Sequence, residues 1–501
     1  MSTMSLALDR ARRLHGSSPA VVDPEGDFTW AAHVDRVARA ADMLAGQGVG
    51  TGERFAILSR NTRRHFELLH AGYWSGAVPV PVNCRLAPPE IAFILEDSGC
   101  RVLFVDPPFA DLLEAPELAP WREDAVEIGA ASDRLIDGAD PVPRHDAAAD
   151  EDAILLYTGG TTGRSKGVRL NHGNVVANGL QVGLAFSFTA ADTFLHAAPM
   201  FHSADLLGTA TTLMGGSHAF LPAFSPENLL GTLADSRATF TMLAPTMIIM
   251  TLQQADPAAH DLGALRAIFY GSAPMAVEWI EKTMQSFAGV ELAQGYGLTE
   301  TAPILTIMDS ATHVAALKAG NTERLKSAGK PVVGVELRLL DDAGNAVDEG
   351  EVAVRGPNVS QGYLNLPEVN AETFRGGWFR TGDIGRLDDE GFLYLLDRKK
   401  DMIVTGGENV YSSEVEAAIY QHPDIAETAV IGVPDETYGE MVVAAVVAQP
   451  GRELDPTALT EHCRARIGGY KIPRRIEVLE AMPKNAMGKI LKTELRRLLS
   501  E

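Results

Sequence analysis

The strongest constraint on the fold of this sequence is an alternation of apolar, β-prone runs with helical patterns through roughly its first 300 residues. Strands that are buried on both faces of a parallel sheet read as continuous apolar runs, and helices connect them. Such runs occupy residues 54–58, 101–105, 239–243 and 265–270, and helical patterns occupy residues 31–45 and 277–287. The alternation therefore predicts an α/β fold with largely parallel, buried strands.

The pattern changes after about residue 330, where short strands and tight turns replace the alternation. Residues 342–345 (DAGN) and 389–391 (DEG) are typical of hairpin turns, so we expect a small antiparallel β unit there. Beyond the charged run 397–401 (DRKKD), helix, strand, strand and helix patterns occupy residues 413–420, 428–433, 442–448 and 459–467. We predict an N-terminal domain over residues 1–397 and an α+β C-terminal domain over 402–501, joined by residues 398–401.

Charge and cysteine content exclude several classes of protein. Asp and Glu number 66 against 43 Lys and Arg, a net charge of −23, and such acidity disfavours nucleic acid as a partner. Cys84, Cys100 and Cys463 form no Cys-x-x-Cys pair, which fits a reducing compartment. No apolar run has the length of a membrane span, and the N-terminus predicts a first packed helix rather than a targeting peptide. We expect a cytoplasmic protein without an integral membrane segment.

One loop has the composition of a phosphate-binding site. The run 157–168 (YTGGTTGRSKGV) follows the apolar run 153–156 and combines glycines, hydroxyls and two cations. Glycines let backbone N–H groups approach an anion, threonines add donors and lysine adds charge. A Walker loop places lysine directly after glycine, but two residues separate Gly163 from Lys166, so an ordinary P-loop NTPase is excluded. A flexible surface turn is the alternative, and it does not explain the cations or the preceding buried strand.

This loop resembles the signature loop of the adenylate-forming superfamily, and Gly160 stands where that loop usually has serine. Six further runs resemble motifs of the same superfamily and follow in its order. They are 199–203 (PMFHS), 270–274 (YGSAP), 294–300 (QGYGLTE), 378–383 (WFRTGD), 397–416 (DRKKD, GGENVY and EVE) and 483–492 (PKNAMGKILK). The sequence is thus similar to the acyl-CoA synthetase branch of the superfamily.

The resemblance implies an ATP-dependent acid–thiol ligase. A carboxylic acid and ATP would give acyl-AMP and pyrophosphate, and acyl-AMP and coenzyme A would then give acyl-CoA and AMP. Because the carboxylate and the α-phosphate are both anionic, such a site needs cations where their charges meet. ATP, Mg²⁺ and coenzyme A are the expected cofactors and substrates.

The resemblance also assigns residues to the first step. Lys489 would bridge the acyl carboxylate and the α-phosphate, and His202 would lie beside that carboxylate. Glu300 would hold Mg²⁺, which prefers oxygen ligands, and Thr299 would donate to the α-phosphate. Thr299 and Glu300 also suit the start of a helix, and the two uses are compatible.

The remaining nucleotide contacts fall into three groups. Asp383 would accept both ribose hydroxyls, and Arg398 would contact ribose or phosphate. The phosphate loop would comprise Thr158, Gly159, Gly160, Thr161, Thr162, Gly163 and Lys166. The adenine slot would comprise Gly271, Ser272, Ala273, Pro274, Gly295, Tyr296 and Gly297.

For the second step, the resemblance implies that residues 398–401 are a hinge and that the C-terminal domain is mobile and rotates about Lys400 or Asp401. The rotation would exchange the loop of Lys489 for the face that carries residues 406–411. Gly406 and Gly407 would permit close backbone approach to the pantetheine arm of CoA, with Glu408 beside them.

The acceptor and the acid are less constrained. Similarity of residues 397–416 to fatty and aromatic acyl-CoA synthetases favours CoA; the alternatives are a stand-alone acyl- or aryl-AMP ligase that loads a carrier protein and a non-catalytic nucleotide-binding protein. The segments expected to line the acyl pocket, 202–207, 240–246, 270–273 and 295–305, are mostly apolar or small, with Asp205 as the exception. They favour a medium- or long-chain fatty acid or an aromatic monocarboxylic acid. A homodimer is the base-rate expectation.

Overall fold

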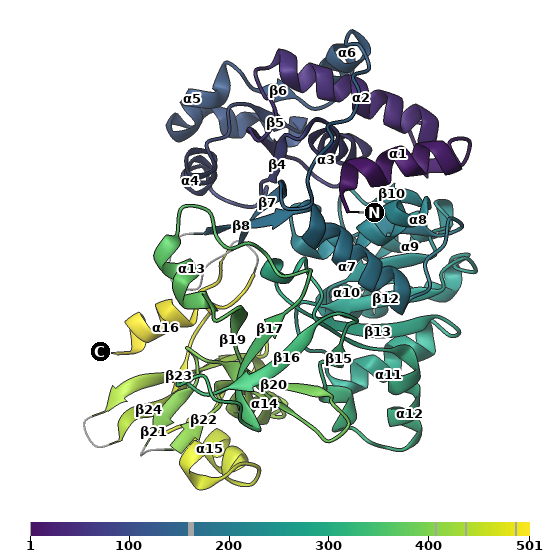
Figure 1. Cartoon of the computed structure of the whole chain (residues 1–501). Coiled ribbons are helices and arrows are strands. Elements are labelled where there is room, and N and C mark those ends of the chain that lie inside the picture. The colour runs from purple at the N-terminus through teal and green to yellow at the C-terminus, as the bar shows by residue number, and fades with distance from the viewer. Residues whose placement is uncertain (1, 159–164, 406–407, 436–437, 486–487, 501) are drawn as a thin grey trace. The chain divides into compact units, whose positions relative to one another are not determined.

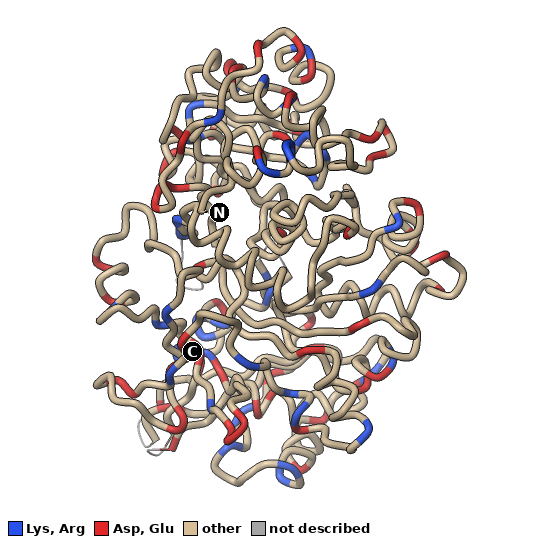
Figure 2. Tube along the Cα trace, turned by 45° about the vertical axis from the view of Figure 1, so that its right-hand side comes forward, with Lys and Arg blue, Asp and Glu red and all other residues tan. Residues whose placement is uncertain are grey.

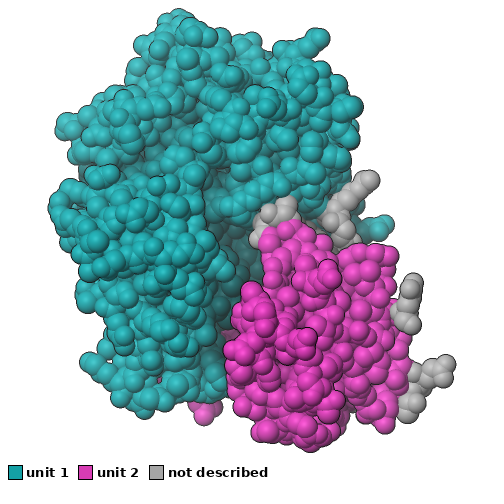
Figure 3. Space-filling model, turned by 180° about the vertical axis from the view of Figure 1, so that it is seen from behind, with its two compact units in different colours: residues 1–159, 165–337, 354–379 teal, residues 160–164, 338–353, 380–501 magenta. Residues whose placement is uncertain are grey.

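The computed structural model describes residues 2–158, 165–405, 408–435, 438–485 and 488–500. They form two compact units, coloured separately in Figure 3. Unit 1 contains residues 2–158, 165–337 and 354–379, and unit 2 contains the described residues of 338–353 and 380–501. The predicted hinge at 398–401 is flanked on both sides by residues of unit 2, so the predicted domain boundary stays a prediction.

The largest sheet of unit 1 confirms the expected parallel α/β pattern. Six neighbouring strands run parallel in the order β13-β12-β11-β9-β10-β1, and the antiparallel strands β14, β15 and β2 extend its edges. All four residues of β11 are buried, and three of them are apolar, as expected for a strand covered on both faces. The bounds are β1 Pro19–Val21, β2 Phe28–Thr29, β9 Thr193–His196, β10 Ser217–Phe220, β11 Phe240–Leu243, β12 Ala267–Gly271, β13 Glu291–Tyr296, β14 Thr306–Met308 and β15 Lys330–Pro331.

Helices occupy the connections between these strands, as the alternation predicts (Figure 1). The expected helix 277–287 is α11, Val277–Ser286. The others in this part of the chain are α8 Thr209–Met214, α9 Pro226–Asp235, α10 Pro245–Gln254 and α12 Ser310–Lys318.

A second, four-stranded parallel sheet has the order β4-β3-β5-β6. Its strands are β3 Arg54–Leu58, β4 Val78–Pro81, β5 Leu103–Val105 and β6 Val126–Glu127. Thr3, Thr29 and Thr62 begin three of the surrounding helices, because each side-chain oxygen accepts a backbone N–H of the first turn. These helices are α1 Met4–His15, α2 Trp30–Gly46 and α3 Arg63–Ser75; α4 Pro88–Ser98, α5 Ala119–Arg122 and α6 Ala130–Asp137 follow.

The glycine- and threonine-rich run lies between two antiparallel strands, β7 Asp152–Thr158 and β8 Lys166–Asn171, which precede α7 His172–Ala185. The buried strand expected at 153–156 is therefore confirmed. The far edge of β8 pairs with a later segment: the N–H of Arg169 donates to the carbonyl of Gly362 over 3.0 Å, and the N–H of Leu364 donates to Gly167 over 2.8 Å. We call residues 357–365 the strap.

The expected antiparallel β unit is present as a five-stranded sheet in which β16, β17, β19 and β18 are neighbours in that order and β20 pairs with β19. The predicted turns at 342–345 and 389–391 lie between β16 and β17 and between β19 and β20. The elements are β16 Glu336–Leu340, β17 Glu349–Arg355, α13 Pro367–Thr373, β18 Phe374–Arg375, β19 Trp378–Leu387 and β20 Leu393–Arg398.

The last hundred or so residues, all in unit 2, form the expected α+β arrangement. Their sheet has the order β22-β21-β24-β23, with β25 parallel to β24. The helix expected over 459–467 ends at Arg464, because the N–H groups of Arg466 and Ile467 both turn back to the carbonyl of Cys463. The elements are β21 Ile403–Thr405, β22 Glu408–Val410, α14 Ser412–Tyr420, β23 Ile425–Asp435, β24 Gly439–Ala448, α15 Pro456–Arg464, β25 Arg475–Val478 and α16 Lys492–Leu499.

No helix in the described part of the chain combines the length and the apolar character that crossing a membrane requires. Acidic and basic residues are interspersed along the trace (Figure 2), and many of them form short-range ion pairs.

Candidate active site

In unit 1, the end of β13 leads into a short 3-10 turn, η5 (Thr299–Thr301), that carries two of the predicted catalytic residues. The Glu300 side chain is buried, with 7% of the residue exposed. Its Oε1 accepts a hydrogen bond of 2.6 Å from the hydroxyl of Tyr363, which belongs to the strap. The N–H of Ser360 donates to the Glu300 carbonyl over 2.8 Å, so both the backbone and the carboxylate of Glu300 are fixed.

Thr299 contacts the run 199–203, which contains His202, the residue predicted to lie beside the acyl carboxylate. The hydroxyls of Thr299 and Ser203 are 3.0 Å apart, which brings the runs 199–203 and 294–300 together. The neighbouring His202 is largely desolvated, and this burial, with the charge of Arg85, lowers its pKa to about 4. His202 is therefore neutral at pH 7, a state that can lie beside a substrate carboxylate as a hydrogen-bond partner.

The described part of the phosphate loop lies beside the strap. Thr158 pairs with Lys166 at the end of the β7–β8 hairpin where the connecting loop begins and ends. The amine of Lys166 is 5.0 Å from the centroid of the Tyr363 ring, a cation–π distance. Lys166 and Glu300 thus both contact the side chain of Tyr363. Gly159, Gly160, Thr161, Thr162 and Gly163 lie outside the described residues.

The predicted adenine slot contains backbone that is unusual for its residue types. Ser272, directly after β12, has a φ of +69°, a conformation that is sparsely populated for residues other than glycine. Ser272, Ala273 and Pro274 are exposed and Tyr296 is half-buried, so both predicted edges of the slot have solvent-facing surface. Strained backbone of this kind is concentrated at functional sites, which supports the assignment.

Packing accounts for the three glycines of this slot independently of any ligand. A Cβ on Gly297 would lie 1.8 Å from the carbonyl oxygen of Pro303, and one on Gly295 would lie 2.1 Å from the Phe269 ring. A Cβ on Gly271 would lie 2.7 Å from the Gly295 carbonyl oxygen. These positions require glycine because chains cross closely behind the slot.

Unit 2 brings three other predicted residues together. Asp383 and Arg398 are register partners in β19 and β20, and Arg398 Nε lies 2.7 Å from Asp383 Oδ1. Lys489 lies in a turn in which its N–H donates to Asn485 Oδ1 over 2.9 Å and Asn485 N–H donates back to its carbonyl. Partial desolvation and the charge of Arg398 lower the pKa of Lys489, while Asp383 opposes this effect.

The predicted hinge residues are held by the C-terminal helix of the same unit. Arg496 of α16 donates to Asp401 Oδ1 over 2.9 Å and to the carbonyl of Lys400 over 3.2 Å. Partial desolvation, with the charges of Arg398 and Lys489, lowers the pKa of Lys400 to about 8 even though Asp401 opposes the shift.

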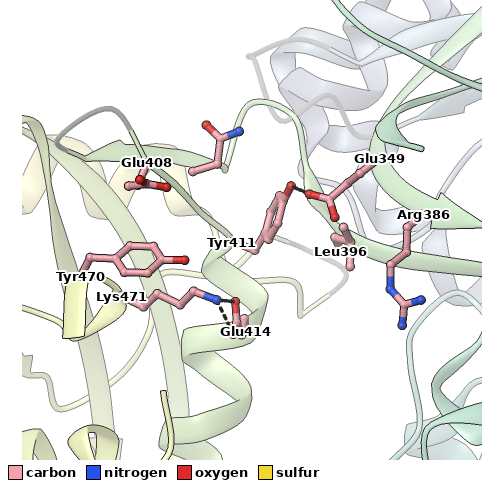
Figure 4. Close-up of a pocket in the computed structure, with 9 residues that line it drawn as sticks. Glu349, Arg386, Leu396, Glu408, Tyr411, Glu414, Tyr470 and Lys471 are labelled. Atoms are coloured by element: carbon pink, nitrogen blue, oxygen red, sulfur yellow. Dashed lines mark hydrogen bonds and ion pairs between the residues drawn. The ribbon is translucent and has the colours of Figure 1, made fainter. Parts of the chain in front are cut away.

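The predicted CoA face can be followed from Glu408 onward, since Gly406 and Gly407 lie outside the described residues. Glu408, Asn409 and Tyr411 line a cavity of about 550 Å³ within unit 2 (Figure 4). Lys471 enters the same cavity and pairs with Glu414 at 2.7 Å, and the Tyr411 hydroxyl donates to Glu349. Carboxylates line much of this cavity, which therefore suits a neutral amide chain better than a polyphosphate.

The side chains present fit a magnesium ion held together with a nucleotide. The described residues contain no group of three or more His, Cys, Asp or Glu that could hold a metal by itself. Mg²⁺ is usually held by one or two carboxylates together with substrate phosphates, and the buried Glu300 carboxylate can supply such a ligand.

Asp205, the polar exception in the predicted acyl pocket, is engaged inside the protein. Its Oδ1 lies 2.6 Å from His196 Nδ1, and the other nitrogen of His196 lies 2.9 Å from His218. Thr212 completes the chain at 3.1 Å from His218. An internally paired carboxylate is a poor partner for a substrate amino group, which weakens the case for an amino acid substrate.

Two residues near the predicted site were missed in the sequence. Tyr363 lies in the run QGYLN (361–365), whose glycine and asparagine indicate a turn but not its contact with Glu300. Arg85 is exposed and lies 5.9 Å from the ring centroid of Phe201, although it is remote from that residue in sequence. Only a spatial arrangement could have identified these two contacts.

Comparisons with known proteins show the family of the chain. A family model described as AMP-binding enzyme matches residues 8–364, and one described as AMP-binding enzyme C-terminal domain matches residues 414–489. The chain is 37% identical over 494 residues to a feruloyl-CoA synthase of an Amycolatopsis species, covering 97% of both chains. It is 36% identical over 490 residues to a long-chain-fatty-acid–CoA ligase of Mycobacterium tuberculosis, covering 96% of this chain and 95% of the relative.

A relative with a different acceptor and a solved structure are also similar. A fatty acid–[acyl-carrier-protein] ligase of Streptomyces coeruleorubidus is 34% identical over 493 residues, with 96% of this chain and 93% of the relative covered. The structure of o-succinylbenzoate coenzyme A synthetase from Bacillus subtilis, in complex with ATP and a magnesium ion, has a TM-score of 0.86 at 30% identity. That match covers 98% of this chain and 99% of the other.

Proposed function

The chain belongs to the AMP-binding enzyme family, and from that premise we propose which acid it activates and how its residues act. It is an AMP-forming acid–thiol ligase: acid and ATP give acyl-AMP and pyrophosphate, and CoA then gives acyl-CoA and AMP. The observation that carries the residue assignments is the buried Glu300 carboxylate, fixed by Tyr363, with Lys166 over the same ring.

In the adenylation step, the residues of this chain position two anions and neutralise their charge. Lys489 is the bridging cation between the acyl carboxylate and the α-phosphate, and Thr299 donates to that phosphate. Asp383 accepts the ribose hydroxyls, with Arg398 beside it at 2.7 Å. Lys166 and the phosphate loop hold the β- and γ-phosphates until pyrophosphate leaves.

Glu300 would hold the magnesium ion, which supplies additional positive charge at the phosphates. His202, neutral at pH 7, orients the acyl carboxylate through a hydrogen bond. Ser272 and Tyr296 border the slot for adenine, supported by the close chain crossings behind Gly271 and Gly295.

For thioester formation we propose that the C-terminal domain turns about Lys400 or Asp401. This turn would remove Lys489 from the acyl carbonyl and present the face of residues 406–411. The cavity next to Glu408 would take the pantetheine arm, whose amides suit its polar lining. Gly406 and Gly407 are assigned to this face by their motif alone.

The acid is proposed to be a medium- or long-chain fatty acid or an aromatic monocarboxylic acid. Names of relatives support both classes, because one is a feruloyl-CoA synthase and another a long-chain-fatty-acid–CoA ligase. The buried Phe240 and Tyr270 in the expected pocket walls are also consistent with an apolar acyl group. Arg85 is an exposed cation beside Phe201, so an acid with a second anionic group is also worth testing.

Coenzyme A is the proposed acceptor, and a carrier protein is the second candidate. The second candidate is favoured by one observation, the 34% identity to a fatty acid–[acyl-carrier-protein] ligase. We further propose a cytoplasmic location, since Cys84, Cys100 and Cys463 are all unpaired, and a homodimer as the assembly.

The first experiment is a pyrophosphate-release assay with acetate, octanoate, palmitate, benzoate, ferulate and malonate, each with and without CoA. A thioester formed from palmitate or ferulate only when CoA is present is the expected result. Adenylate that accumulates and does not react with CoA would favour a carrier protein instead. Preference for malonate would contradict the monocarboxylate proposal.

The Lys489→Ala variant separates the two half-reactions. Loss of the bridging cation should reduce adenylation by at least about a hundredfold, in line with the removal of one charged group from a transition state. Conversion of supplied acyl-adenylate to thioester should stay within about threefold of wild type, because Lys489 has left the site by then. Equal loss of both half-reactions would contradict the proposed rotation.

A further inference from the structure

Tyr363 contacts both a predicted metal ligand, Glu300, and the lysine of the phosphate loop, Lys166. Its hydroxyl donates to Oε1 of Glu300 over 2.6 Å. Its ring lies 5.0 Å from the amine of Lys166. Tyr363 and Glu300 are each 7% exposed, so this arrangement lies largely away from bulk water.

The hydrogen bond to Glu300 matters because the carboxylate is buried. A hydrogen bond to an ionised group is stronger than one between neutral groups and holds it in one orientation. The bond engages Oε1 and leaves Oε2 as the oxygen for a cation. Without it, the carboxylate could rotate, and a lone metal ligand that rotates binds more weakly.

Helix α13 and strand β8 fix the position of Tyr363. Asn370 Oδ1 accepts the N–H of Tyr363 over 2.7 Å, and Asn370 Nδ2 donates to its carbonyl over 2.8 Å. Val168 forms a β-bridge with Tyr363, which connects the strap to the strand that begins at Lys166. Tyr363 is therefore a rigid link between the phosphate-loop hairpin and the turn of Glu300.

We propose that Tyr363 is a positioning residue that couples magnesium binding at Glu300 to phosphate binding at Lys166. Its hydroxyl orients the carboxylate that holds the ion, and its ring holds the lysine amine on the side of the same phosphates. The inference rests on the proposed function, because it needs ATP and Mg²⁺ to be the ligands of this site.

The test is equilibrium binding of ATP to the full chain by isothermal titration calorimetry, without acid substrate, with Mg²⁺ or with EDTA. Wild type should bind ATP more tightly with Mg²⁺. In Tyr363→Phe, the gain in ATP affinity caused by Mg²⁺ should be about tenfold smaller than in wild type. This is the loss expected for one hydrogen bond to a charged group. Its affinity in EDTA should stay within about twofold of wild type, since the ring that faces Lys166 is retained.

Tyr394→Phe is a matched control. The Tyr394 hydroxyl donates to Asp388 Oδ2 over 3.2 Å, and the Arg386 guanidinium lies 4.2 Å from its ring centroid. The same chemical change is thus made in a tyrosine with a carboxylate and a cation as neighbours, but outside the proposed site. This variant should keep the full Mg²⁺-dependent gain.

Glu300→Gln completes a double-mutant cycle. If Tyr363 acts through Glu300, the combination Tyr363→Phe/Glu300→Gln should show no loss of the Mg²⁺-dependent gain beyond that of Glu300→Gln alone. Equal weakening of ATP binding in Mg²⁺ and in EDTA by Tyr363→Phe would indicate a general structural role and overturn the inference. An unchanged Mg²⁺-dependent gain would overturn it as well, while leaving the proposed function intact. Failure of wild type to bind ATP would instead refute the proposed function.

Discussion

Lys489 combines an exposed position with an electrostatic environment that favours proton loss. Partial desolvation of the amine and the positive charge of Arg398 lower its pKa, and Asp383 and Asp401 only partly compensate. The turn that carries it is closed by Asn485, so the backbone of the lysine is fixed while its amine can reach a ligand. Adenylation needs the protonated amine, and this requirement makes the reaction sensitive to pH.

We therefore predict an alkaline limb in kcat/KM for adenylation at a lower pH than an ordinary lysine would give. Because the pKa of Lys489 is lowered, the amine loses its positive charge as pH rises through that value, and the rate falls. The guanidinium of Lys489→Arg stays charged, so this variant should show a flat profile up to about pH 10 at a lower absolute rate. Pyrophosphate release measured from pH 7 to 10.5 gives both profiles.

Lys484→Arg is the control for this prediction. Lys484 lies in the same motif, but its amine pairs with Glu427 at 2.7 Å. Its pH profile should match that of wild type. An alkaline limb that persists unchanged in Lys489→Arg would assign the titration to another group.

At the scale of elements, the positions of Thr299 and Glu300 in unit 1 depend on two stretches of backbone that pass very close to each other, at Gly297 and Pro303. The end of β13 and the segment after η5 approach so closely that Gly297 has no room for a side chain, because the Pro303 carbonyl lies 1.8 Å from the position of its Cβ. Asn358 Nδ2 binds the carbonyls of Thr301 and Ile304, at 2.8 Å and 2.9 Å, and holds this crossing from the strap. The positions of Thr299 and Glu300 follow from it.

Gly297→Ala should destabilise unit 1 by about 3 kcal/mol, since the obstacle is backbone that cannot move aside. It should also abolish detectable ATP binding. Gly231→Ala, in helix α9, is the matched substitution: nothing lies within 4 Å of its Cβ position, so alanine should stabilise by up to about 1 kcal/mol. Urea unfolding followed by tryptophan fluorescence measures both; equal effects of the two substitutions would contradict the crossing argument.

Elements with a long, regular pattern could be predicted from the sequence, and contacts between distant elements could not. The apolar run 54–58 coincides with β3 because each residue after the first is buried. The run of glycines after β7 indicated a loop, but its place between two hairpin strands depends on the pairing of Leu156 with Val168. The residues of the site were found through motifs, whereas the bond between Tyr363 and Glu300 joins positions 63 residues apart and has no local signal.

At the scale of the whole molecule, titratable and fluorescent groups are divided unequally between the two units. All five tryptophans, at positions 30, 74, 121, 279 and 378, belong to unit 1. Several buried histidines with lowered pKa values belong to the same unit. Burial lowers the pKa of His33 to about 3, of His65, His172 and His202 to about 4, and of His70 and His218 well below the usual value. Tryptophan fluorescence therefore reports the unit in which these histidines lie.

We predict that unit 1 loses stability between pH 7 and pH 5. A histidine near pKa 6.5 in the unfolded chain takes up a proton in this window, whereas one whose folded-state pKa is near 3 or 4 does not. The unfolded state therefore binds more protons, and each such histidine lowers the free energy of unfolding by up to about 2 kcal/mol at pH 5. Urea unfolding at pH 7, 6 and 5, followed by tryptophan fluorescence, should show a midpoint that falls steadily with pH.

The change in unfolding free energy between pH 7 and pH 5 can be assigned to a histidine by removing that histidine, whatever the absolute stability of the variant. His33 lies 2.9 Å from His70 through their ring nitrogens, and His33→Gln keeps a hydrogen-bonding side chain while removing one titrating group. The difference in unfolding free energy between pH 7 and pH 5 should then shrink by up to about 2 kcal/mol, whatever the stability of the variant at pH 7. His422→Gln, in unit 2, should leave the difference unchanged, because no tryptophan reports that unit. A midpoint that is constant or rises toward pH 5 would show that these histidines are protonated in the folded protein, and the neutral state assigned to His202 would then need revision.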